Sequence, residues 1–156
     1  MSDANNMLND PEVLRELIMD HYQYPHNHKL LDEKEAADKN YLSVHMASDS
    51  CIDDITVQSR IKDGKIEDIR FDGVACTIST ASTSMMTDLL KGKSIDEARE
   101  IIRNYFNMID AKEYDPDVLE EAVAMKNVYK QANRIKCATI GWKAINQMID
   151  ESEGKK

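Results

Sequence analysis

The 156-residue chain lacks the features that favour nucleic-acid or membrane binding. It carries 20 lysines and arginines against 29 aspartates and glutamates, for a formal net charge of −9. Nucleic-acid binding needs a dense basic face, and the basic residues here are dispersed. No apolar run approaches the roughly 18 residues that cross a membrane, and the opening MSDANNMLNDPE lacks the basic and apolar regions of a signal peptide. We therefore expect a cytoplasmic protein without nucleic-acid or membrane partners.

Cysteine is also scarce, and the three cysteines are too widely spaced for a disulfide framework. They stand at positions 51, 76 and 137, so reduced thiols are expected. Asp53 follows Cys51 by two residues, and the period of a strand puts both side chains on one face while Asp54 points to the other. Three thiolates and one carboxylate suffice for tetrahedral zinc or for one edge of an iron–sulfur cluster. From spacing alone, three buried cysteines are an equal alternative.

The first half of the chain predicts one helix followed by a small sheet. Asp10-Pro11 reads as a helix start, with aspartate as N-cap and proline in the first turn, and Pro25 ends that helix. Strands are expected at about residues 41–47, 51–61 and 65–73. The last two are joined by a hairpin turn at Asp63-Gly64. Such short links predict an antiparallel sheet of three strands with one covered face.

The second half predicts helices, which makes the fold class α+β with helices packed on one face of the sheet. They are expected at about residues 78–92, 94–109, 115–129 and 137–151. Ser79 is the expected cap of the first, just after Cys76, and Cys137 opens the last. Because a helix N-terminus stabilises a thiolate, both positions favour metal-binding sulfur. We expect a single domain over residues 1–156, with flexible tails at about 1–9 and 151–156.

Longer stretches carry a family resemblance. DHYQYPHN, CID, FDGVACTISTAS and RIKCATIGW together resemble the U-type iron–sulfur assembly proteins, the family of IscU, SufU and the N-terminal domain of NifU. The resemblance covers nearly the whole chain. It implies that the metal ligands are Cys51 and Asp53, matching the family's C-G-D motif, Cys76, matching G-C-x-I-S, and the late Cys137.

The resemblance is closest to the SufU branch. Lys136 stands where the IscU branch has a histidine before its last cysteine, and the long helical segment that precedes Cys137 fits the SufU insertion. Arg134 matches the branch's R-x-K-C, which implies that it pairs with a thiolate. From the residues alone, a solvated arginine at a helix start is an equal alternative.

The implied function is zinc-dependent sulfur transfer. As a sulfurtransferase-like carrier, the protein would accept persulfide sulfur on Cys51 from a SufS-type cysteine desulfurase and serve downstream iron–sulfur assembly proteins. One alternative is a scaffold that holds a transient iron–sulfur cluster on the same ligands and passes it to apo-proteins. Another is a small domain in which the metal is purely structural.

Two departures from the family pattern concern the site and a nearby histidine group. Asp49 and Ile52 replace the proline and glycine that flank the first cysteine, and a β-branched isoleucine restricts the backbone that glycine leaves open. His26 replaces the arginine of the early P-R-N. It lies with His21 and His28 around Pro25, but no carboxylate–histidine spacing supports a metal site there, so we predict surface or packing roles.

Overall fold

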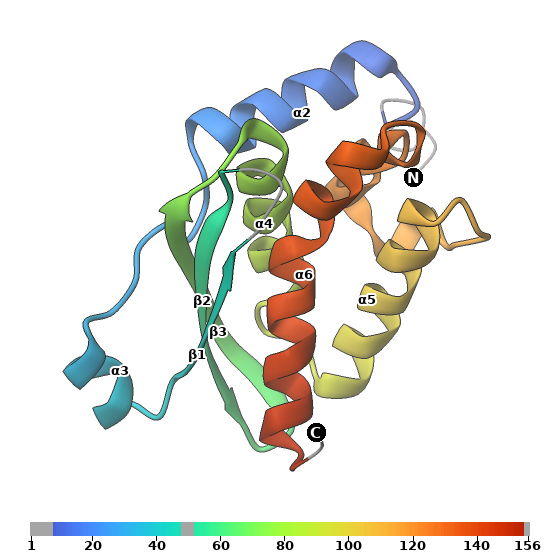
Figure 1. The fold of residues 1–156 in the computed structure, drawn as a ribbon. Coiled ribbons are helices and arrows are strands. Elements are labelled where there is room, and N and C mark those ends of the chain that lie inside the picture. The colour runs from blue at the N-terminus through green and yellow to red at the C-terminus, as the bar shows by residue number, and fades with distance from the viewer. Residues whose placement is uncertain (1–7, 48–51, 155–156) are drawn as a thin grey trace.

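The computed structural model describes residues 8–47 and 52–154, and the sheet they form is the predicted one. Strands β1 (Leu42–Ala47), β2 (Asp54–Lys62) and β3 (Lys65–Val74) form an antiparallel sheet in the order β1-β2-β3 (Figure 1). The predicted hairpin turn joins β2 to β3, with φ of 54° at Asp63 and 74° at Gly64. Positive φ at both turn residues matches the twist of the strands, which is why Asp-Gly marks this turn in the sequence.

The helices are largely those predicted. Their bounds are α2 (Pro11–Gln23), α3 (Glu33–Asp38), α4 (Thr77–Leu90), α5 (Ile95–Ile109), η1 (Pro116–Val118), η2 (Glu120–Met125), η3 (Val128–Lys130) and α6 (Ala132–Ser152). The short α3 was not predicted. The prediction of one α-helix at 115–129 is wrong, because the segment forms three short 3-10 helices instead. A left-handed backbone at Glu120, with φ of 48°, interrupts the run that Asp115 and Pro116 begin.

The helical layer covers one face of the sheet, as predicted. Helix α6 packs on β1 and β2, α4 packs on β3, α5 packs on the outer side of α6, and α2 crosses α4 (Figure 1). The opposite face is not simply polar. Gln58 lies on that face, yet it is buried because its side chain exchanges two hydrogen bonds with the backbone of Leu31, at 2.8 and 3.0 Å.

Asp68 on β3 ties together three parts of the fold. Its carboxylate accepts a hydrogen bond from the Tyr41 hydroxyl at 2.5 Å and one from Arg70 Nε at 2.8 Å, and it lies 3.1 Å from Lys91 Nζ. Burial alone would raise the pKa of Asp68, but these three donors outweigh it and hold the pKa below its ordinary value. The carboxylate therefore fastens the start of β1 and the end of α4 to β3.

A buried polar network fixes α4 against α6. Ser82 Oγ and the Tyr105 hydroxyl both donate to the backbone oxygen of Ala138, each at 2.6 Å, and Trp142 Nε1 donates to Ser82 Oγ at 3.1 Å. The rings of Tyr105 and Trp142 stack with centroids 3.8 Å apart, and Trp142 is fully buried. Because every partner is satisfied inside the core, the network sets one register between the two helices.

Small residues let the same two helices approach closely. A Cβ atom added to Gly141 in α6 would lie 2.4 Å from Thr83 Oγ1 in α4, well inside van der Waals contact. Gly141 lies one turn after Cys137, and Thr83 lies one turn after Ser79, so these positions face the same helix–helix seam. The close packing thereby brings Cys137 toward the start of α4.

Candidate metal centre

The site is built around the start of α4, where Cys76 is the N-cap. Its backbone is extended, with φ of −71° and ψ of 173°, and its Sγ accepts a hydrogen bond from the backbone N–H of Ser79 at 3.5 Å. The prediction of Ser79 as the cap is therefore wrong. The helix already begins at Thr77, so Ser79 lies inside its first turn, and its hydroxyl donates to Asp53.

Asp53 lies directly before β2 and is only 2% exposed. One carboxylate oxygen accepts the backbone N–H of Cys76 at 2.9 Å, and the other accepts the Ser79 hydroxyl. Its neighbour Asp54 points outward and pairs with exposed His45 at 2.6 Å. The two aspartates point in opposite directions, as the alternation of a strand predicts, and two hydrogen bonds hold Asp53 in place. The predicted alignment of Cys51 with Asp53 lies outside the described residues.

A glycine at the end of β3 allows this approach. Gly73 has φ of 136°, and a Cβ atom there would lie 2.0 Å from the backbone oxygen of Asp54. No other residue fits both the conformation and the space. The close pairing of Gly73 with β2 is what brings the following Cys76 beside Asp53.

Cys137 is buried, but it does not open a helix. Helix α6 begins five residues earlier at Ala132, so the prediction that this thiol lies at a helix N-terminus is wrong, and the dipole argument for its thiolate fails. The segment NRIK contains no helix breaker, and the helix extends through it. The Cys137 thiol donates within the helix to the backbone oxygen of Asn133 at 3.8 Å.

Asp53, Cys76 and Cys137 converge. One potential ligand atom from each lies within 4.8 Å of the others. Burial, followed by the nearness of Cys76 and Asp53, raises the pKa of the Cys137 thiol far above its ordinary value. Three groups that become anionic cannot share a buried space at low cost unless a cation joins them, and thiolate and carboxylate donors suit zinc. The group therefore fits a metal, while Cys51, the fourth expected ligand, lies outside the described residues.

A hollow of about 820 Å³ opens beside Cys76. Its walls come from α2, the start of α4, the segment between η2 and α6, and Ile52, which is 66% exposed. The charged side chains among its described lining residues are Arg15 and Arg134. Arg134 thus lies in the first turn of α6 and borders the same hollow as the Cys76 sulfur. Two guanidinium groups give this hollow a positive character on a chain whose net charge is −9.

Comparison with known proteins identifies the family. A family model described as the NifU-like N terminal domain matches residues 14–156. The chain belongs to this family. The zinc-dependent sulfurtransferase SufU of Bacillus subtilis (strain 168) is 37% identical over 143 residues, which cover 91% of this chain and 92% of that protein. The iron–sulfur cluster assembly scaffold protein IscU of Streptococcus pyogenes serotype M1 is 39% identical over 137 residues, 87% of this chain and 82% of that protein.

Solved structures agree with this assignment. A crystal structure from Fervidobacterium islandicum AW-1, described as a candidate iron–sulfur cluster assembly scaffold protein for the SUF system, superposes with a TM-score of 0.75 at 30% identity and covers 84% of this chain and 92% of that one. The resemblance seen in the sequence is confirmed, and the chain is a NifU-like member of the iron–sulfur cluster assembly proteins. Within the described residues, no helix is long and apolar enough to cross a membrane.

Sequence reasoning missed the part that Ser79 plays in the site. The serine donates its hydroxyl to Asp53 and its backbone N–H to Cys76, so it touches two of the converging groups. Its place three residues after Cys76, in the first turn of a helix, was the available signal. A side chain at that position lies beside its N-cap residue, so it can reach the same site.

Proposed function

We propose that this NifU-like protein is a zinc-dependent sulfur-transfer protein that accepts persulfide sulfur from a cysteine desulfurase for iron–sulfur cluster assembly. The observation that carries the proposal is the convergence of Asp53, Cys76 and Cys137 in a chain 37% identical to a protein named a zinc-dependent sulfurtransferase. These three residues and Cys51 would hold the zinc. Lys136, in place of a histidine before the last cysteine, also favours this branch of the family.

Bound zinc would supply the positive charge that keeps the thiols deprotonated and protected from oxidation. The protein's own residues prepare the site for this. The two hydrogen bonds to Asp53 fix the direction of its carboxylate, and the contact with Ser79 fixes the Cys76 sulfur at the helix start. Such supporting hydrogen bonds commonly change metal affinity by about 10–100-fold when they are removed.

Sulfur transfer in this proposal ends on Cys51. Its thiolate attacks the outer sulfur of the desulfurase persulfide, and a new S–S bond forms to Cys51. The S–S bond of the donor breaks, and the donor cysteine leaves as a thiolate, so no outside oxidant or reductant is needed. Arg15 and Arg134 support this step, because a positive hollow beside the site attracts an anionic persulfide and steadies the thiolate charge.

A sulfur-transfer assay tests the proposal. The zinc-loaded protein is incubated with a SufS-type cysteine desulfurase and cysteine, and mass spectrometry then locates the added sulfur. We expect one sulfur atom on Cys51 and no transfer to Cys51→Ser, while the Asp54→Asn control accepts sulfur as the unaltered protein does. Sulfur on Cys76 or Cys137, with Cys51→Ser still active, would overturn the assignment.

A scaffold function is the second candidate, favoured by the 39% identity to a protein named an iron–sulfur cluster assembly scaffold. The same residues would then hold a transient cluster for transfer to an apo-protein. Anaerobic purification separates the two functions. Colourless protein with zinc supports sulfur transfer, and brown protein that passes its cluster to an apo-ferredoxin reverses the ranking.

A further inference from the structure

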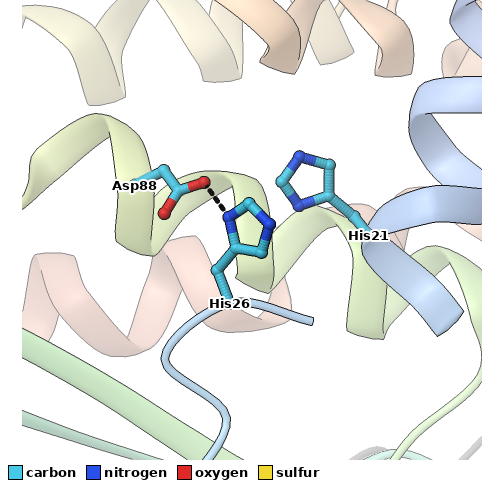
Figure 2. A group of neighbouring side chains, drawn as sticks. All are labelled: His21, His26 and Asp88. Atoms are coloured by element: carbon cyan, nitrogen blue, oxygen red, sulfur yellow. Dashed lines mark hydrogen bonds and ion pairs between the residues drawn. The ribbon is translucent and has the colours of Figure 1, made fainter. Parts of the chain in front are cut away.

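A second group of metal-binding side chains lies at the far end of α4. His21 comes from the last turn of α2, His26 from the segment that follows it, and Asp88 from the last turn of α4 (Figure 2). One potential ligand atom from each lies within 4.8 Å of the others. Sequence spacing did not reveal this group, because Asp88 lies more than 60 residues after both histidines.

The two histidines are held in place by the same serine. Ser84 Oγ accepts the backbone N–H of His26 at 2.8 Å and lies 2.7 Å from Nδ1 of His21. The rings stand with their centroids 4.7 Å apart. His26 Nδ1 is hydrogen-bonded to Asp88, and Nε2 of His21 lies 2.8 Å from the Glu121 carboxylate. The group is therefore oriented by its neighbours, as metal-binding histidines are.

Charge and space around the group favour a cation. Asp88 and Glu121 are both half exposed, and with Glu120 and His26 they border a hollow of about 240 Å³. Within residues 8–47 and 52–154, the ion pairs that Asp88 and Glu121 form are with these histidines and with no lysine or arginine. The two carboxylates therefore have no permanently charged partner among the described residues. A bound cation would take the place of their hydrogen bonds with the two histidines.

We propose that His21, His26 and Asp88 form a second site for a divalent transition-metal ion, with Glu121 as a fourth donor. Two imidazoles and two carboxylates suit Zn²⁺ and Fe²⁺. The site is distinct from the cysteine centre, since Asp88 comes twelve residues after Cys76 along α4, about 18 Å at 1.5 Å per residue. It offers nitrogen and oxygen donors, whereas the cysteine centre offers mainly sulfur. The inference does not depend on the proposed sulfur transfer.

Cobalt titration tests the site, because thiolate-bound Co²⁺ absorbs strongly through sulfur-to-metal charge transfer and Co²⁺ bound by nitrogen and oxygen does not. Full-length protein carrying one equivalent of zinc is titrated with Co²⁺. We expect one further equivalent with weak visible bands only, displaced by Zn²⁺ or, anaerobically, by Fe²⁺. His26→Ala and Asp88→Asn should weaken it at least about tenfold. His45→Ala, which removes an equally exposed histidine paired to Asp54, should leave it unchanged.

The outcomes decide the proposal in either direction. Retention of the first zinc equivalent shows that each variant is folded, and Asp88→Asn keeps the size of the side chain where His26→Ala does not. Absence of a second equivalent in the unaltered protein would overturn the site. So would equal affinity in Asp88→Asn and the His45→Ala control, or cobalt that neither Zn²⁺ nor Fe²⁺ displaces.

Discussion

Substitution of Gly141 by alanine tests how the packing of α4 against α6 builds the cysteine centre. The new Cβ would meet three atoms of Thr83, at 2.4, 2.8 and 3.0 Å, and all three belong to a short side chain buried between the helices. The contact can be relieved only by moving Thr83 or by separating the helices. Since Cys137 lies one turn before Gly141, separation moves that sulfur away from Cys76.

The expected magnitude follows from two opposing effects. Overpacking of a well-filled core costs about 1–3 kcal/mol, and with contacts this short we take a value of about 3 kcal/mol. Alanine regains about 1 kcal/mol over glycine inside a helix. The net loss of about 2 kcal/mol should lower the melting temperature by roughly 4–8 °C for a chain of this size. Zinc affinity should fall about tenfold, as it does when the support of a metal ligand is disturbed.

The assay is thermal unfolding by circular dichroism together with competitive zinc titration. The matched rescue is Gly141→Ala combined with Thr83→Ala, which removes the two nearest clashing atoms, Oγ1 and Cγ2, and leaves only Cβ at 3.0 Å. The hydroxyl that is lost is buried and has no hydrogen-bond partner among the described residues. The double variant should recover both stability and zinc affinity. The reasoning fails if Gly141→Ala is as stable as the unaltered protein, or if the double variant is no better than the single one.

Three further predictions concern charge and metal. Asp53→Ala should retain zinc on the three thiolates but bind it more weakly, whereas Asp54→Ala should change zinc affinity little; equal losses in a competition titration would contradict the strand-face assignment. Asp68→Asn should lose about 1–2 kcal/mol at neutral pH. Because the folded-state pKa of Asp68 is lowered, that difference should be complete above its ordinary value of 3.8 and vanish as pH falls through the folded-state pKa, as acid titration of unfolding would show. Chelation of zinc should lower the melting temperature, because binding to the folded state alone adds stability; an unchanged value after verified metal loss would count against the site.

Local sequence rules predicted the parts of this fold that depend on neighbouring residues. Asp63-Gly64 fixes its own turn through the backbone freedom of two adjacent positions. The alternation of a strand was enough to separate buried Asp53 from exposed Asp54. The family resemblance supplied the wider pairing of Asp53 with Cys76 and Cys137, which no local rule contains.

The errors lie where contacts distant in sequence decide the outcome. Ser79 belongs to the site because Asp53, from a distant part of the chain, accepts its hydroxyl. The grouping of His21 with Asp88 depends on how α2 crosses α4, which spacing along the chain does not encode. The segment before α6 carries a helix-start signal at Asp115 but departs from α-helix at Glu120, whose left-handed backbone no local pattern marks.

X-ray absorption at the zinc edge tests the central claim most directly, because it reports which atoms hold the metal in the cysteine centre. Protein loaded with one zinc equivalent should give a coordination shell of three sulfurs and one oxygen, which becomes two sulfurs in Cys76→Ser and again in Cys137→Ser. A shell of nitrogen and oxygen alone, or a sulfur count that neither substitution changes, would contradict the assignment of these thiols as zinc ligands.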